Sequence, residues 1–390
     1  MNFDEIIDLK ARHASKWTLY DKAFGVKTDN ALPMWIADMD FAAPEFLNRC
    51  VHDIADAGYY GYFNRLPQYF TAVQWWLKTR HNWDVDTDWM TVTAGLGNGI
   101  ATAITAFTEP GEGVLIFTPV YHEFTYKIQK TGRRVVQCPL ATIDGRFQLD
   151  FETYEAFMKG DERLMILSSP HNPGGRIWTI EELKEIGAFC EKHDLILIAD
   201  EIHADLIFPG ETFVTAAVAA PSVAERMLVM TSASKAFNIA GTRTGCVTIQ
   251  NPDLREKFRT TLAKTDLSPN LFGVAMSQAA LSQEGTAWID GVTAYIQKNA
   301  RVFAQGLSEI PGVSVMPMQS TYLSWVDFER TGIDPAALWD RVTKDAGIVP
   351  SPGPEFGIGG EFGHRFNLAT PRIRIVEAVE RMQKAFADLQ

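Results

Sequence analysis

Seven short apolar runs alternate with helical patterns between about Met90 and Ile249. They read WMTVTA, GVLIFTP, RRVVQCPL, RLMILSSP, LILIAD, RMLVMTS and TGCVTIQ. Most are unbroken by polar residues, which is typical of strands that are buried on both faces. Between them, TIEELKEIGAFCEKHD predicts a helix that is capped by Thr179, with Glu182 three residues later. The alternation predicts the α/β class, with a mostly parallel seven-stranded sheet and helices on both faces.

The chain is 390 residues long and therefore longer than an ordinary single domain. Helical patterns follow the last strand-like run, and the sequence turns strand-like again at GVSVMPMQSTYLSWVDF. We therefore expect a large α/β domain over residues 46–285 and a smaller α+β domain over residues 286–390. Residues 1–45 hold too few elements for a core of their own, so we expect them to pack on the smaller domain.

Composition excludes several classes of protein. The formal net charge of −12 argues against a nucleic-acid partner, which requires clustered basic residues. The four cysteines form no CxxC pair, so we expect reduced cysteines and no metal site. The sequence has no long apolar span and no signal-peptide pattern at its start. We therefore expect no membrane partner and a cytoplasmic location.

Polar residues follow four of the predicted strands. The segments are TAGLGNG after MTV, SPHNPGG after LMIL, DEIH after LILIA, and SASK after LVMT. Ligands of α/β proteins gather at the carboxyl ends of the strands, in the loops. The four segments therefore predict a single site at one edge of one sheet.

The glycine-rich segment predicts an anion site. Gly95, Gly97 and Gly99 leave backbone N–H groups free to approach an anion, just before a helix that we expect to begin near Ile100. A phosphate would fit, although a plain tight turn explains this segment equally well. The GxGxG spacing differs from GxGxxG, so a dinucleotide site is not indicated.

Asp200 ends the apolar run LILIAD, where an ionised carboxylate is costly unless it meets a cation or several donors. A protonated ring nitrogen of a cofactor would be such a cation, and capping of the next turn is the alternative. Asn172 lies in HNPGG, a segment with ordinary turn chemistry. It becomes a candidate because the predicted sheet places it beside Asp200.

Lys235 follows Ser232 and Ser234, and Arg243 lies in the next loop. A solvated lysine is the ordinary alternative, but here an apolar strand delivers the lysine to the edge of the sheet. A desolvated lysine beside other positive charge has a lowered pKa, which Schiff-base chemistry with an aldehyde requires. The serines and the arginine are suitable phosphate donors.

An aldehyde, a phosphate and a ring nitrogen together describe pyridoxal 5'-phosphate (PLP). The order of glycine loop, NPGG, Asp and SxSK resembles that of the fold-type I PLP-dependent aminotransferase class I/II superfamily. Within it, the sequence is similar to the MalY/PatB-like cystathionine β-lyase branch in MWIADMDF, DEIHADL, SKAFNIAG, STYLSWVDF and FGHRFNLATPR. The resemblance implies PLP as the cofactor and the PLP-dependent transferase fold type I.

The resemblance also implies roles for individual residues. Lys235 would form the Schiff base with the cofactor, Asp200 would pair with its pyridine nitrogen, and Asn172 would bond its phenolic oxygen. Tyr121 in TPVYHEF would stack on the ring. The implied phosphate cup consists of Gly95, Leu96, Gly97, Ser232, Ser234 and Arg243.

Other implied residues face the substrate or a partner subunit. Arg365 would take the α-carboxylate of an amino-acid substrate, and the backbone of Ile36 and Ala37 would close that end. Tyr62 matches a tyrosine that reaches across from a partner subunit, which implies a homodimer. His203 stands where many aminotransferases have a tyrosine, and it would support Asp200 or the ring oxygen.

Two reactions stay open. The first is C–S β-elimination, in which L-cystathionine or a related cysteine S-conjugate yields a thiol, pyruvate and ammonia. The second is transamination between an amino acid and a 2-oxo acid, which uses the same residues. TAGLGNG is more glycine-rich than the TPGVVP-like segment of the lyase branch, and Arg243 is more typical of aminotransferases. A non-catalytic regulatory module is a third hypothesis, and the lysine and the acidic charge disfavour it.

Overall fold

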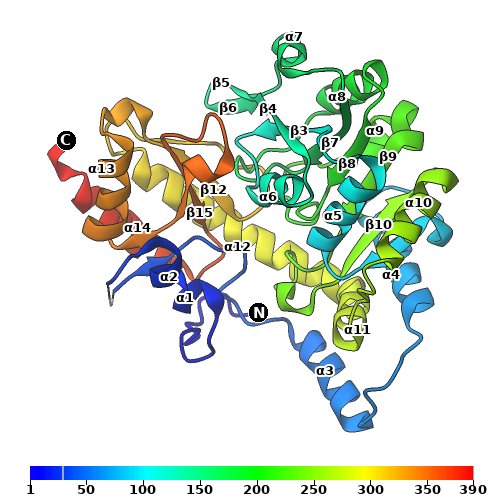
Figure 1. Cartoon of the computed structure of the whole chain (residues 1–390). Coiled ribbons are helices and arrows are strands. Elements are labelled where there is room, and N and C mark those ends of the chain that lie inside the picture. Colours follow the sequence, from blue (N-terminus) through cyan, green and yellow to red (C-terminus); the bar gives the residue numbers. More distant parts are fainter. Residues whose placement is uncertain (29, 390) are drawn as a thin grey trace.

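The computed structural model describes residues 1–28 and 30–389. Its main feature is a seven-stranded sheet in the order β2-β10-β9-β8-β7-β3-β4 (Figure 1). The strands are β2 (Met90–Thr93), β3 (Gly113–Thr118), β4 (Arg134–Pro139), β7 (Glu162–Ser168), β8 (Ile196–Asp200), β9 (Met227–Thr231) and β10 (Gly245–Ile249). Only β10 within this sheet runs antiparallel to its neighbours. The predicted seven-stranded, mostly parallel sheet is confirmed.

Helices cover both faces of this sheet. Leu197 packs with Met165 in one buried cluster, whereas the next residue, Ile198, packs with Ile166 in another, because successive side chains of a strand point to opposite faces. The first cluster includes the apolar face of α8 (Ile180–Lys192), and the second includes that of α5 (Leu96–Phe107). The predicted arrangement of helices on both faces is therefore confirmed.

The cap of α8 forms as its sequence predicts. Thr179 Oγ1 accepts a hydrogen bond from Glu182 N at 3.1 Å, and Thr179 N donates to Glu182 Oε2 at 2.8 Å. This reciprocal pair satisfies two N–H groups that the first turn of a helix leaves free. The other helices of six residues or more are α3 (Glu45–Ala57), α4 (Leu66–His81), α6 (Glu123–Lys130), α10 (Pro252–Ala263), α11 (Leu271–Ala280), α12 (Gln283–Leu307), α13 (Pro335–Asp340) and α14 (Arg372–Ala385).

A second, smaller sheet lies in the C-terminal part of the chain. Its four antiparallel strands are in the order β11 (Ser314–Val315), β12 (Leu323–Asp327), β15 (Gly363–Asn367) and β14 (Ser351–Pro352). Helices α12 and α14 pack against each other, and their buried residues belong to the same cluster as those of β12 and β15. Within the described ranges, no helix is both long and apolar enough to cross a membrane.

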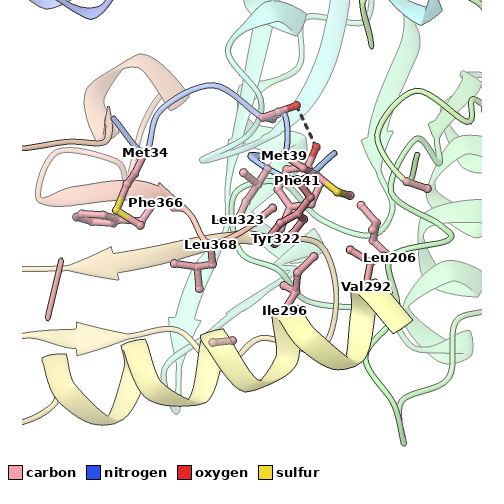
Figure 2. Packing of buried hydrophobic residues seen from close by; sticks show 14 of the residues in the cluster. Met34, Met39, Phe41, Leu206, Val292, Ile296, Tyr322, Leu323, Phe366 and Leu368 are labelled. Atoms are coloured by element: carbon pink, nitrogen blue, oxygen red, sulfur yellow. Dashed lines mark hydrogen bonds between the residues drawn. The ribbon is translucent and has the colours of Figure 1, made fainter. Parts of the chain in front are cut away.

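The N-terminal segment packs on this second sheet. Strand β1 (Leu32–Pro33) pairs in parallel with β13 (Ile348–Val349). Met34, Met39 and Phe41 lie in one cluster with residues of β15 and α12 (Figure 2). The division of the chain into an N-terminal segment, a large domain and a small domain, with boundaries after residues 45 and 285, stays a proposal. Helix α12 runs across the second of these boundaries.

Candidate active site

The carboxyl ends of β2, β7, β8 and β9 lie at the same edge of the sheet. Ser168 at the end of β7 is in register with Asp200 at the end of β8, and Asp200 is in register with Met230 of β9. Strand β10 connects β9 to β2 by antiparallel pairing on both sides, which makes β2 parallel to β9. The four polar segments therefore meet at one edge, as the sequence predicts.

The glycine loop leads directly into α5. The helix begins at Leu96, and the prediction of a start near Ile100 was therefore wrong. Gly95 has a φ of +84°, a conformation that residues with a side chain rarely adopt. Because of this sharp turn, only two residues separate the end of β2 from the start of the helix. Within the described part of the chain, the N–H groups of Leu96 and Gly97 have no acceptor. They form the positive end of α5, which favours an anion.

The residues of the predicted phosphate cup lie beside this helix end. Arg243 has its Cα atom 3.7 Å from the place that a Cβ atom of Gly95 would take. Ser232 donates from Oγ to Thr244 O at 2.7 Å and accepts from Ser234 N at 3.1 Å. The residues predicted for the cup therefore bring backbone N–H groups, two serines and an arginine to this end of α5, and their binding of a phosphate stays a prediction.

Lys235 follows β9 and reaches the N-terminal segment. Its Nζ donates to Ala37 O at 2.6 Å. Tyr322 donates from its hydroxyl to the same oxygen at 3.0 Å, the hydrogen bond that is dashed in Figure 2. Burial lowers the pKa of Lys235 to about 8. About one tenth of the amine is thus neutral, and therefore nucleophilic, at pH 7, far more than for an ordinary lysine.

Asp200 is 5% exposed at the end of β8. Its Oδ1 accepts from Ile202 N at 3.2 Å, and burial raises the pKa of the carboxyl to about 6. His203 lies one turn further on, where burial lowers its pKa to about 3, and its Nδ1 has no hydrogen-bond partner among residues 1–28 and 30–389. A buried carboxylate of this kind is suited to a positively charged ligand group.

Arg365 and Asn172 meet in the interior of the site. Arg365 is 3% exposed, and its Nη1 donates to Asn172 Oδ1 at 3.0 Å. Its Nη2 donates to Trp35 O at 2.6 Å and to Ser351 Oγ at 3.0 Å. Burial lowers the pKa of this guanidinium to about 10, which still leaves it charged at neutral pH. A fixed, buried guanidinium is a strong partner for a carboxylate.

The two predicted tyrosines have different places. Tyr121 follows β3 and donates from its backbone N to Asn172 O at 3.1 Å, which ties it to the site. Burial raises the pKa of its phenol to about 12. Tyr62 lies between α3 and α4 with its side chain fully exposed, and no hydrogen bond joins it to the other candidate residues.

The N-terminal segment supplies carbonyl groups that the sequence predicted only in part. Ile36 O accepts from Asn367 Nδ2 at 2.6 Å, and Ala37 O accepts from Lys235 and Tyr322. The roles of Trp35, Ser351, Tyr322 and Asn367 were missed. These residues lie in the segments MWIADMDF, STYLSWVDF and FGHRFNLATPR or on the edge strand β14, and only the pairing of the second sheet brings them together.

A buried ion cluster holds the N-terminal segment around Ala37 in place. Lys16 is 2% exposed, and its Nζ lies 2.9 Å from both Asp38 Oδ1 and Asp40 Oδ1. Arg374 also pairs with Asp40, at 3.1 Å. Nothing in the sequence singled out this cluster. Among residues 1–28 and 30–389, no group of three His, Cys, Asp or Glu side chains is placed to hold a metal ion.

The fold and this strand-end site define a member of a known enzyme class. The family model for aminotransferase class I and II matches residues 39–382, and the chain belongs to this family. It is 35% identical to cystathionine beta-lyase PatB of Bacillus subtilis over 390 residues, which cover 99% of this chain and 100% of PatB. It is 28% identical to protein MalY of Escherichia coli, with 97% of each chain covered.

A solved structure shows the same relationship. Cystalysin from Treponema denticola, whose crystal structure contains a pyridoxal 5'-phosphate cofactor, superposes with a TM-score of 0.94. The two sequences are 33% identical, and the match covers 100% of this chain and 99% of that chain. The predicted fold and the predicted resemblance to the PatB and MalY branch are confirmed.

Proposed function

We propose that this chain is a PLP-dependent C–S β-lyase, which cleaves L-cystathionine or a related cysteine S-conjugate to a thiol, pyruvate and ammonia. The observation that carries the proposal is the single buried site in which Lys235 and Asp200 lie at adjacent strand ends beside the Arg365–Asn172 pair. The similarity to PatB and to cystalysin over the whole chain supports both the reaction and the cofactor.

The residues of the site fit the chemical groups of PLP. The free N–H groups of Leu96 and Gly97, with Ser232, Ser234 and Arg243, suit its phosphate. The buried Asp200 suits its ring nitrogen, and the side chain of Asn172 suits its phenolic oxygen. Tyr121 supplies an aromatic face, and the Nδ1 atom of His203, which no described residue partners, is available for a supporting contact. When bound, PLP supplies an aldehyde that captures amines and a ring that accepts electrons.

The residues of this chain would then have distinct roles in the reaction. Lys235 Nζ would hold the aldehyde and would be placed to take a proton from the Cα of a bound substrate. Asp200 would stabilise the positive charge of the ring nitrogen. Arg365 binds the α-carboxylate by a two-pronged contact and fixes the orientation of the Cα–H bond. The carbonyl groups of Ile36 and Ala37 close this end of the site.

Transamination is the second candidate, favoured by the family to which the chain belongs and by the aminotransferase-like Arg243. One experiment separates the two reactions: the holoenzyme receives L-cystathionine without any 2-oxo acid, and pyruvate and free thiol are measured. Continued turnover supports the lyase. Arrest after one equivalent, with the spectrum of the pyridoxamine form, would overturn it in favour of transamination.

We also propose a homodimer in which Tyr62 completes the site of the partner subunit. In support, Tyr59, Tyr60 and Tyr62 are all more than 60% exposed in this single chain, and exposed clusters of aromatic residues are typical of interfaces. Coexpression of Lys235→Ala with Tyr62→Ala chains tests this. Hybrid dimers should recover activity that neither variant shows alone, whereas no recovery in confirmed hybrid dimers would contradict the proposal.

We propose a cytoplasmic location because the four cysteines are free, as is typical of proteins in a reducing compartment, and three of them are buried. Fractionation of the source cells followed by immunoblotting tests it, and recovery of the protein outside the cytoplasmic fraction would overturn it.

A further inference from the structure

Helix α6 carries a lysine to the amino end of α5. Helix α6 begins at Glu123, two residues after Tyr121, and packs against α5. Lys127 lies one turn further along, and its side chain is 19% exposed. A Cβ atom built on Gly97 would lie 3.1 Å from Lys127 Cε and 3.5 Å from Nζ. The Lys127 side chain therefore lies directly over Gly97, in the space that the missing side chain leaves.

This position matters because Gly97 belongs to the first turn of α5. Its N–H group and that of Leu96 have no acceptor within the described ranges, and they point to the place that suits a phosphate. Burial has the largest effect on the pKa values of Asp200 and His122, and the positive charge of Lys127 lowers both. The contact with Gly97 is what places the ammonium group at the helix end.

The only hydrogen-bond partner of the Lys127 ammonium within the described residues is Glu123, whose Oε2 lies 2.5 Å from Nζ. An ammonium group has three donors, so two remain for another acceptor. A phosphate monoester carries a charge of about −1.5 to −2 at pH 7, whereas Arg243 supplies only one positive charge to the predicted cup. A second cation at this place would complete the neutralisation.

We propose that Lys127 is a further phosphate-binding residue of the cofactor site and that Glu123 positions its ammonium group over the amino end of α5. This inference rests on the proposed function, because it assigns a residue to the PLP site of that function. None of the sequence motifs pointed to Lys127. The alternative is an ordinary ion pair between residues i and i+4 of an exposed helix face, which has no effect on the cofactor.

The test compares Lys127→Met with Lys130→Met. Lys130 lies on the same helix, but its ammonium is 5.8 Å from the centre of the Tyr126 ring and away from Gly97, so it is a matched control. Apoenzyme of each variant is titrated with PLP and, separately, with pyridoxal, which lacks the phosphate. Dissociation constants come from the absorbance of the bound cofactor, and circular dichroism checks the fold of each variant.

We expect Lys127→Met to weaken PLP binding by about 10- to 100-fold, the range for a charge-assisted contact, and to leave pyridoxal binding unchanged. Lys130→Met should leave both unchanged, and Lys127→Arg should restore much of the PLP affinity. Equal PLP affinity of Lys127→Met and wild type, or an equal loss for pyridoxal, would overturn the role of Lys127 alone. A wild-type apoenzyme that binds no PLP would instead overturn the proposed function, and the role of Lys127 with it.

Discussion

Arg365 Nη1 donates a hydrogen bond to Asn172 Oδ1 at 3.0 Å, and this contact joins the four-stranded sheet to the end of the seven-stranded sheet at the site. Asn172 follows β7 of the large sheet, whereas Arg365 lies on β15 of the small one. The sequence predicts them as separate residues, one for the cofactor ring and one for the substrate carboxylate. In the proposed function, this contact would make the position of the substrate depend on the position of the cofactor.

Replacing Arg365 by lysine should weaken substrate binding. The guanidinium of Arg365 donates hydrogen bonds to Asn172, Trp35 and Ser351. The ammonium group of a lysine cannot keep this planar set of hydrogen bonds and also bind a carboxylate with two contacts. We expect KM for the amino-acid substrate to rise about 10- to 100-fold, with a smaller fall in kcat. Arg372→Lys, outside the site, is the control, and an unchanged KM for Arg365→Lys would contradict the assignment.

Lys235→Ala and Ser234→Ala should have different effects. The first removes the amine proposed for the Schiff base, so the yellow absorbance should disappear and turnover should fall by about 100- to 10,000-fold. The second removes one hydroxyl of the phosphate cup, so it should mainly speed cofactor loss during dialysis. Absorbance spectra before and after dialysis separate the two, and normal colour and activity in Lys235→Ala would overturn the whole site.

Capture of PLP by the apoenzyme should depend on pH through Lys235. Only the neutral amine attacks an aldehyde, and burial lowers the pKa of Lys235 to about 8. The rate constant should therefore rise with pH below about 8 and level off above it. Stopped-flow absorbance measures this rate. A rate that still rises about tenfold between pH 8 and pH 9 would indicate an ordinary solvated lysine instead.

Replacing Lys16 by methionine should destabilise the protein. The change removes the cation that Asp38 and the buried Asp40 share. Breaking a buried pair costs about 3–5 kcal/mol, and we expect a loss at or below the lower end of this range because Arg374 still pairs with Asp40. Urea unfolding of the apoenzyme measures the loss in the free energy of unfolding. An equal midpoint and slope for the variant and the wild type would show that the cluster adds no stability.

The pH dependence of this loss has a definite sign. Burial lowers the pKa of Lys16, but the two carboxylates outweigh it and raise that pKa above 10.5, so its contribution to stability is present below 10.5 and fades at higher pH. Burial raises the pKa of Asp40, but Lys16 and the hydrogen bond from Trp17 outweigh it and lower that pKa below 3.8. The Asp40 contribution is present above 3.8 and fades in acid. The difference between variant and wild type should therefore be constant from about pH 5 to 9.

Much of the site could be predicted because its residues follow buried strands. Asp200, Asn172 and Lys235 each lie within four residues of the end of a parallel strand, so the alternation of apolar runs and helices was enough to place them at one edge. The helix start at Leu96 was not predicted, because a glycine turn of two residues replaced the longer loop that the spacing suggested.

The sequence by itself determined the seven strands, the edge at which their polar ends meet, and the lysine, carboxylate and amide delivered there, because these follow from local periodicity and parallel pairing. Only the tertiary structure decided that Trp35 and Ser351 hold Arg365, that Lys16 fixes the segment under Lys235, and that Lys127 lies over Gly97. These contacts join residues from different elements of the fold. A local sequence pattern cannot predict them, because it does not determine how far apart two such elements lie in space.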